Sequence, residues 1–191
     1  MGENKPDTTL AQQALLPREP QRIAHRELDI LLQHCAQLDV SDITIQTGMP
    51  VFSEIHGRLY PNTRRALTHS EVGSILNTIY GPNGTAQLLT GTDIDTNYEL
   101  KPDRMTRYRY RVNATACLVE GHQGIQITLR TIPTDPPTID TMHLPDKLLE
   151  ALTPNDGIIY ITGATGSGKS TLLASIIRHI AEDPNCHRKI L

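Results

Sequence analysis

The stretch that decides the fold reads Gly163-Ala164-Thr165-Gly166-Ser167-Gly168-Lys169-Ser170, followed by Thr171. The pattern G-x-x-x-x-G-K-S is typical of the loop that holds phosphates in nucleoside-triphosphate enzymes. An apolar, β-branched segment at residues 157–162 precedes the loop and predicts a buried strand. Apolar residues at helical spacing follow it, namely Leu172, Leu173, Ile176, Ile177 and Ile180. A strand, a glycine loop and a helix in this order point backbone N–H groups and a helix N-terminus at a phosphate.

The residue types of this loop match the chemistry of a bound nucleotide. Glycines let the backbone curl around a phosphate where a Cβ would collide. We expect Lys169 to contact the β- and γ-phosphates and the Ser170 hydroxyl to be a ligand of Mg²⁺. The alternative is a glycine-rich turn without a ligand, which the complete pattern in its context disfavours. We therefore predict ATP and Mg²⁺ as cofactors, bound by residues 163–171.

Length, composition and charge narrow the class of protein. The chain has 191 residues, of which 38% are hydrophobic, and a formal net charge of −3. This suits one or two domains and argues against a strongly basic protein that binds nucleic acid. Cys35, Cys117 and Cys186 are scattered without a C-x-x-C motif, as expected of reduced thiols in the cytosol. The sequence has no signal peptide and no run of about 18 apolar residues. We expect a cytoplasmic protein without a transmembrane segment and without strong nucleic-acid binding.

Composition and periodicity divide the chain into four segments and predict an α/β protein. Residues 1–24 are polar, contain prolines and have little periodicity, so we expect disorder. Residues 25–132 predict an α+β domain. Residues 133–146 are dense in proline, which predicts a stiff, extended linker. Residues 147–191 contain the glycine loop and predict the start of a phosphate-loop domain.

Local signals place helices and strands in the first domain. Apolar residues at helical spacing predict a helix over 25–39, and alternating residues predict strands over 41–47 and 51–55. Thr68 and Glu71 have the spacing of a capping box, which predicts that a helix begins there.

Two further strands are predicted over residues 107–118 and 125–130, and they contain a row of arginines. Arg107, Arg109 and Arg111 alternate with apolar residues and therefore share one face of the sheet. If Val119 pairs with Gly124, Arg130 lies opposite Asn113 on that same face. The residues alone favour a solvated outer face, with Arg107 and Arg109 meeting Glu99 or Asp103. The alternative is a set of arginines that contacts the phosphates of a nucleotide.

The end of the sequence leaves the phosphate-loop domain short. Ile190 and Leu191 resemble the beginning of a second strand. A domain of this class needs more parallel strands, a carboxylate that holds Mg²⁺ through water, and a residue that orients the attacking water. We therefore expect the chain to be an N-terminal fragment of a longer protein, with an incomplete catalytic site.

Four motifs together resemble the type II/type IV secretion ATPase superfamily over residues 27–191. The motifs are Ser41-Asp42-Ile43-Thr44-Ile45-Gln46-Thr47-Gly48-Met49-Pro50 with Gly57-Arg58-Leu59, Tyr110-Arg111-Val112-Asn113-Ala114, Leu129-Arg130-Thr131-Ile132-Pro133, and residues 163–171. The details are most similar to the DotB/TraJ branch of type IVB secretion and conjugal-transfer ATPases. Thr44 stands where pilus retraction ATPases usually have histidine.

The resemblance implies a PAS-like N-terminal domain, a linker and a RecA-like ATPase domain in a homo-hexameric ring. ATP hydrolysis would drive substrate export or machine assembly at an inner-membrane secretion or conjugation complex. It also implies that Arg111 and Arg130, which match family motif positions, approach the nucleotide phosphates, so the functional interpretation of these arginines gains weight. Two alternatives stay open: a type IV pilus retraction-type ATPase, and a docking module that does not hydrolyse ATP.

Overall fold

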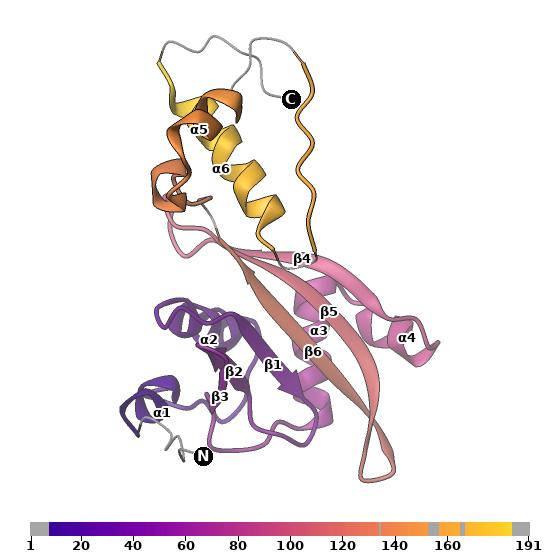
Figure 1. Cartoon of the computed structure of the whole chain (residues 1–191). Coiled ribbons are helices and arrows are strands. Elements are labelled where there is room, and N and C mark those ends of the chain that lie inside the picture. Colours follow the sequence, from indigo (N-terminus) through magenta and orange to yellow (C-terminus); the bar gives the residue numbers. More distant parts are fainter. Residues whose placement is uncertain (1–7, 134, 153–156, 165–166, 185–191) are drawn as a thin grey trace, which may run out of the picture. The chain divides into compact units, whose positions relative to one another are not determined.

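The computed structural model describes residues 8–133, 135–152, 157–164 and 167–184. The chain forms two compact units, Met1–Thr134 and Asp135–Leu191, whose elements are drawn in Figure 1. The boundary between the units falls within the segment that the prolines mark as a linker. Each unit has a core of its own.

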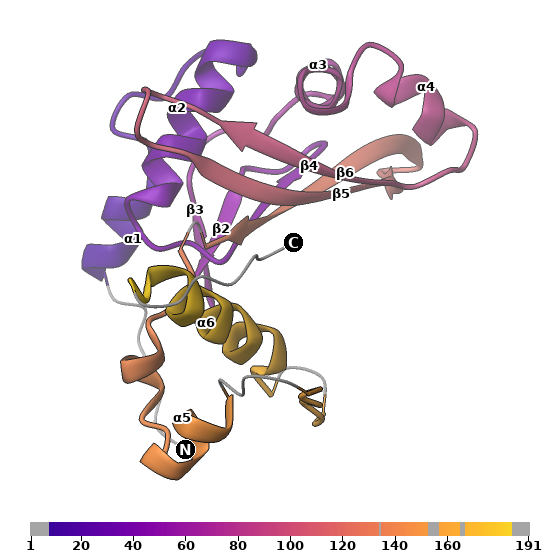
Figure 2. The same ribbon diagram turned by 90° about the horizontal axis from the view of Figure 1, so that it is seen from above.

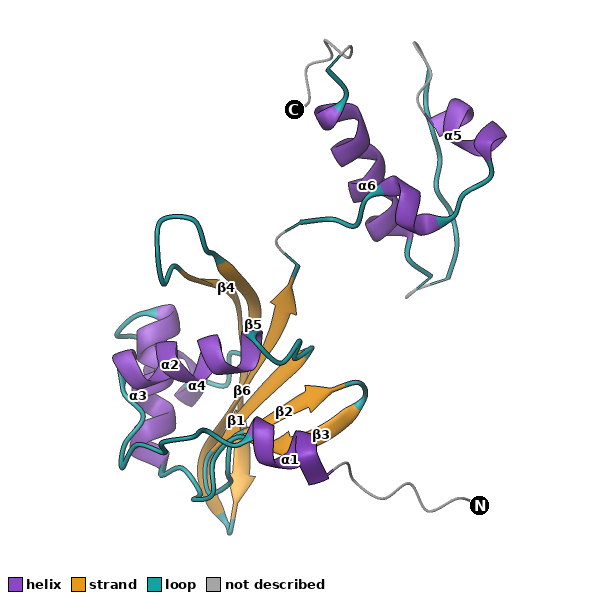
Figure 3. Cartoon of the chain, turned by 90° about the vertical axis from the view of Figure 1, so that its left-hand side faces the viewer, coloured by secondary structure: helices purple, strands orange, loops and turns teal. Residues whose placement is uncertain are grey.

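The first unit is built on a six-stranded antiparallel sheet with the order β3-β2-β1-β6-β5-β4. Its strands are β1 Asp42–Gln46, β2 Phe52–Ile55, β3 Arg58–Pro61, β4 Ile94–Leu100, β5 Tyr108–Val119 and β6 His122–Ile132. Its helices are α1 Thr8–Ala14, α2 His25–Ala36, α3 His69–Tyr80 and α4 Gly84–Leu89. Helices α2, α3 and α4 cover one face of the sheet (Figures 2 and 3). The predicted α/β class is confirmed.

Alternation along the strands explains which face the helices cover. Tyr110, Val112 and Ala114 of β5 point into the core and are at most 1% exposed, whereas Arg111 and Asn113 between them are exposed. The Tyr110 hydroxyl donates a hydrogen bond to the Leu32 carbonyl of α2 at 3.2 Å. Beside it, burial raises the pKa of the Cys35 thiol to about 12, so this cysteine is a packing residue and not a nucleophile.

The expected disorder of residues 1–24 is wrong for residues 8–24. Helix α1 lies there, and Ala14, Leu16 and Ile23 are buried in the core of the first unit. Asn62 holds this segment through two hydrogen bonds. Its side-chain amide donates to the Ala14 carbonyl at 3.0 Å, and its backbone carbonyl accepts from Leu16 N–H at 2.9 Å. This packing depends on Asn62 and Glu71, which are distant in sequence, so local composition did not indicate it.

The capping box at the start of α3 is confirmed, and its glutamate has a wider role. Thr68 Oγ1 accepts from Glu71 N–H at 3.3 Å. The Glu71 carboxylate accepts from Thr68 N–H (3.0 Å), from Ile23 N–H (3.0 Å), and from the Arg65 guanidinium (2.7 and 3.0 Å). Burial alone would raise the pKa of Glu71, but the hydrogen bonds from Arg65, Thr68 and Ile23 outweigh it and lower the pKa to about 2.

The second unit is smaller and mostly helical among its described residues. It contains the 3₁₀-helix η1 Ile139–Met142 and the helices α5 Asp146–Leu152 and α6 Lys169–Glu182. Ile139, Leu152 and Ile176 form its core. The expected linker is therefore not wholly extended, because it contains η1 and because Ile139 packs against Ile176 of α6.

The strand predicted over residues 157–162 is not formed as a paired strand within the described residues. Ile158 and Tyr160 are 77% and 82% exposed. A strand is stabilised by hydrogen bonds to a neighbouring strand, and the described part of this unit supplies none. In the described part of the chain, every helix is too short or too polar to cross a membrane.

Replacing Glu71 by glutamine should lower the free energy of unfolding by about 2–3 kcal/mol, because the Arg65 and backbone donors lose a charged acceptor. The folded-state pKa of about 2 lies below the ordinary value of 4.5. The stabilisation by Glu71 should therefore be complete above pH 4.5 and be lost as the pH falls through 4.5 toward 2. Urea unfolding at several pH values measures both effects.

Glu99→Gln is the matched control, because the Glu99 carboxylate is also paired, with Lys101 and Arg109, but on the surface. It should change the unfolding free energy much less than Glu71→Gln. Equal effects of the two substitutions would contradict the role assigned to Glu71.

Candidate functional site

Helix α6 begins with backbone donors that no side chain in the described part of the chain caps. Gly168 is the N-cap in a left-handed conformation (φ 81°, ψ 11°), which a residue with a Cβ adopts only under strain. The first hydrogen bond of the helix runs from Leu172 N–H to the Gly168 carbonyl at 2.8 Å. The N–H groups of Lys169, Ser170 and Thr171 therefore have no acceptor within the helix, and no side chain of the described residues caps it. This end also carries the positive pole of the helix dipole.

The lysine and the glycines shape the loop in front of this helix. Lys169 Nζ donates to the Ala164 carbonyl at 2.6 Å, so the ammonium group lies against the loop backbone. A Cβ added at Gly163 would lie 2.8 Å from Ser167 Oγ, so a larger residue would displace that side chain. Thr165 and Gly166 lie outside the described residues. Of the other loop residues, Ser167, Gly168, Lys169 and Thr171 line one pocket.

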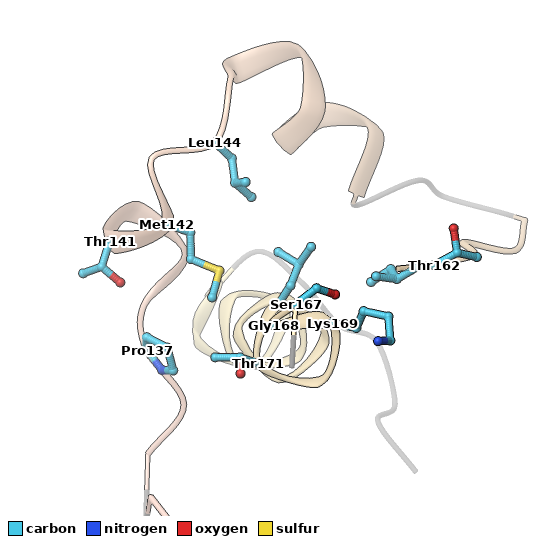
Figure 4. Close-up of a pocket in the computed structure, with 11 residues that line it drawn as sticks. Pro137, Thr141, Met142, Leu144, Thr162, Ser167, Gly168, Lys169 and Thr171 are labelled. Carbon is cyan, nitrogen blue, oxygen red and sulfur yellow. The ribbon is translucent and has the colours of Figure 1, made fainter. Parts of the chain in front are cut away.

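A pocket of about 520 Å³ opens beside the start of α6 (Figure 4). One part of its lining is the loop and the first turn, with Ser167, Gly168, Lys169, Thr171 and Leu172. The other part comes from the segment before α5, with Pro137, Thr141, Met142 and Leu144. Sequence reasoning missed this second group because the prolines suggested a linker. Ile139 is a single apolar residue among polar neighbours, and one such residue does not indicate packing by itself.

The arrangement suits an anion that carries a metal ion. Free N–H groups, a helix dipole and an ammonium group favour negative charge, and the Ser170 hydroxyl is exposed on the first turn. The described residues contain no group of three or more His, Cys, Asp or Glu side chains that could hold a metal by themselves. A Mg²⁺ ion here would therefore need a phosphate as well as Ser170, and the residues present fit ATP with Mg²⁺.

The arginines of the first unit lie together, in a register two residues away from the expected one. Val119 pairs with His122, which brings Arg130 opposite Arg111 and not Asn113. Such a shift keeps the side chains on the same face. Arg109, Arg111 and Arg130 are all on the face away from the helices.

Each of these arginines is paired with a carboxylate on a neighbouring strand. Arg111 binds Asp95 through two hydrogen bonds (Nε–Oδ1 3.2 Å, Nη2–Oδ2 2.7 Å), and Arg130 Nε lies 2.9 Å from Asp42 Oδ1. The Arg109–Glu99 pair that the sequence suggested is confirmed, at 3.2 Å. The hydrogen bond from Arg111 lowers the pKa of Asp95, and Asp95 in turn raises that of Arg111.

Arg111 and Arg130 therefore face a depression of about 210 Å³ in which their charges are balanced by Asp42 and Asp95. This is the solvated, charge-paired surface that the residues alone favoured. Both arginines belong to the first unit, and residues 163–171 belong to the second.

The comparisons with known proteins agree with the loop and with the fold. The family described as Type II/IV secretion system protein matches residues 100–190. The X-ray structure of the ATPase DotB from Legionella pneumophila is 62% identical with a TM-score of 0.78, over 87% of this chain and 45% of that chain. The chain belongs to the type II/IV secretion ATPase superfamily. The identity with DotB supports the DotB-like branch that the motifs predicted.

More distant members of the superfamily are similar over the same region. The structure of the pilus retraction motor PilT with bound ADP is 26% identical with a TM-score of 0.63, over 80% of this chain and 43% of that chain. The type IV pilus ATPase PilU of Pseudomonas aeruginosa is 28% identical over 161 residues, which are 84% of this chain and 40% of PilU. The chain thus spans less than half the length of these relatives.

The ion pair between Arg111 and Asp95 can be tested by titration. In the Arg111→Gln variant the pKa of the Asp95 carboxyl should rise toward its ordinary value, because the hydrogen bond and the positive charge are both removed. Carboxyl carbon NMR shifts recorded from neutral pH to pH 2 measure this pKa. Arg109→Gln is the control, since Arg109 pairs with Glu99 and should leave Asp95 unaffected. The pairing would be refuted by an Asp95 titration that is the same in both variants.

Proposed function

We propose that this chain is the nucleotide-binding portion of a motor ATPase and that it binds ATP with Mg²⁺ at residues 163–171. The observation that carries the proposal is the uncapped start of α6 behind a glycine loop, with Lys169 against that loop. The family supports nucleotide use, because DotB is an ATPase and PilT is known with bound ADP.

The residues would divide the work of binding as follows. The N–H groups of the first turn of α6 donate to phosphate oxygens, and Gly163 and Gly168 keep the approach free of side chains. Lys169 Nζ gives up its hydrogen bond to the Ala164 carbonyl and donates instead to the phosphates nearest the loop. A hydrogen bond between two charged groups is stronger than one to a neutral carbonyl. The Ser170 hydroxyl is a ligand of Mg²⁺, which neutralises phosphate charge.

The whole protein would act as a homo-hexamer that couples ATP hydrolysis to substrate export or machine assembly. We place it in the cytoplasm, associated with an inner-membrane secretion or conjugation complex. The 62% identity with DotB favours this role over pilus retraction, because PilT and PilU are only 25–28% identical to the chain.

Arg111 and Arg130 are proposed to contact the phosphates in the assembled motor. Their present partners are the carboxylates of Asp95 and Asp42, so contact with a phosphate would require them to exchange one anion for another. Both arginine side chains are 65% or more exposed, which leaves them accessible for such an exchange.

The Lys169→Ala variant should bind ATP in the presence of Mg²⁺ at least about tenfold more weakly than the unmodified chain, because a charge-assisted contact to phosphate is lost. Isothermal titration calorimetry measures the dissociation constants. Lys147→Ala is the matched control, since Lys147 is an exposed lysine of α5 in the same unit. If Lys169→Ala binds ATP as tightly as Lys147→Ala does, the nucleotide site lies elsewhere.

A further inference from the structure

A second pocket lies in the first unit, on a surface that the nucleotide site does not include. It has a volume of about 430 Å³ and lies between the segment that follows α1 and the first turns of α2, which are labelled in Figure 1. Its lining combines three apolar residues, Leu16, Pro20 and Ile30, with charged residues, of which Arg18 and Arg26 are exposed. The volume is within the range of pockets that receive a ligand.

The wall formed by α2 presents a side chain that the fold does not need. Leu28, Leu31 and Leu32 of this helix are fully buried in the core. Arg26 and Ile30 are four residues apart, so they lie next to each other on the surface of the helix. Ile30 is 51% exposed, although the side of an amphipathic helix that faces away from the core is ordinarily polar. This isoleucine therefore contributes mainly to the pocket and little to the core.

The opposite wall, residues 16–20, is held in place by the loop after β3. Both oxygens of the Glu19 carboxylate accept hydrogen bonds from backbone N–H groups, from Arg64 at 2.9 Å and from Arg65 at 3.1 Å. Arg65 Nε also donates to the Pro20 carbonyl at 3.2 Å. The pocket is thus preformed by contacts within the first unit.

The carboxylates around this pocket are all engaged by donors within the protein. Glu19 accepts from the loop after β3, as described above. Glu27 accepts from Ala24 N–H at 3.2 Å, and Asp29 accepts from the Tyr98 hydroxyl at 3.3 Å. No further acidic residue occurs in the sequence between residues 16 and 30. The negative charges of this surface therefore already have partners.

By contrast, the arginines of the same surface have no carboxylate partner among the described residues. Arg18, Arg22 and Arg26 are all exposed, and no hydrogen bond or ion pair joins any of them to another residue in the described part of the chain. The outward arginines of the sheet differ, since Arg111 and Arg130 each bind an aspartate. An arginine forms its strongest hydrogen bonds with a carboxylate or a phosphate. The three arginines therefore make a surface that suits an anion.

The shape of this surface favours a peptide over other anions. Arg22 does not line the pocket, so the positive surface extends beyond it and suits a ligand longer than the pocket. A membrane surface binds apolar side chains that project from a protein, whereas Leu16 and Pro20 lie inside a recess. Such a recess receives a projecting side chain of another protein. The formal net charge of the whole chain is −3, so a local positive surface determines where an acidic ligand docks.

We infer that this pocket and its three arginines, Arg18, Arg22 and Arg26, form a docking site for an acidic segment of a partner protein. An apolar side chain of that segment enters the pocket beside Ile30, and the carboxylates next to it pair with the arginines. The site is separate from residues 163–171. It therefore goes beyond the proposed function, and its test requires no nucleotide.

The test begins with a library of random short peptides displayed on phage and selected on the unmodified chain. The selected peptides should share an acidic residue next to a leucine, isoleucine, methionine or phenylalanine. Fluorescence anisotropy then measures the dissociation constant of one selected peptide and of a glycine form, in which glycine replaces its apolar residue. The unmodified chain should bind the glycine form at least about threefold more weakly, because the pocket is left unfilled.

Variants of the chain locate the binding site of the selected peptide. Arg18→Gln combined with Arg26→Gln should weaken binding about tenfold, because two charge-assisted contacts are lost. Ile30→Ala should weaken binding of the selected peptide about threefold and leave the glycine form within about twofold, because only the selected peptide fills the pocket. Arg58→Gln is the matched control, since Arg58 lies in β3 of the same unit and does not line the pocket. It should change binding by less than about twofold, because a charge that does not contact the peptide is screened by salt.

The inference would be overturned by any of three results. One is a selection whose peptides share no acidic and apolar residues. Another is that Arg58→Gln weakens binding as much as the double substitution does, which would indicate a general effect of net charge. The third is binding to vesicles of phosphatidylcholine and phosphatidylglycerol that the double substitution abolishes and the selected peptide does not inhibit, which would assign this surface to a membrane. Thermal unfolding should be the same in the variants at Arg18, Arg26 and Ile30, because these side chains are exposed.

Discussion

Glu71 keeps its negative charge inside the first unit, where its carboxylate accepts hydrogen bonds from Ile23, Thr68 and Arg65. A buried charge is tolerated only when its hydrogen-bonding capacity is met, so these three groups must stay where they are. Ile23 ends the N-terminal segment and Thr68 begins α3. One carboxylate thus fixes both the N-terminal segment and a helix that covers the sheet. The paired arginines lie on the opposite face of that sheet.

The first N–H groups of a helix have no acceptor within the helix, and the two units differ in how they treat these groups. Helix α3 satisfies its first N–H groups internally, through the Thr68 hydroxyl and the Glu71 carboxylate. The N-cap of helix α6 is Gly168, which has no side chain, and among the described residues no side chain caps the first N–H groups, which lie beside an ammonium group. The first arrangement stabilises a fold and the second receives an anion.

Much of this could be predicted from the sequence where the signal is local. The glycine and lysine spacing predicted the loop and the start of α6, and the Thr68–Glu71 spacing predicted the start of α3. The alternation of β5 predicted its outward arginines but not their register, because the turn after Val119 is tighter than assumed. Glu120 and Gly121 both have positive φ (50° and 80°), as in a two-residue hairpin turn. The packing of Ile23 on α3 and of Ile139 on α6 depends on contacts distant in sequence, which a single apolar residue does not indicate.

The place where Mg²⁺–ATP binds is measured most directly by backbone amide NMR shifts of the ¹⁵N-labelled chain during titration with the nucleotide. The largest changes should occur at Gly168, Lys169, Ser170 and Thr171, whose N–H groups would donate to phosphate. The core strands of the first unit should change little. A titration in which the first turn of α6 is unaffected, or in which the changes are confined to the first unit, would contradict the site proposed for this chain.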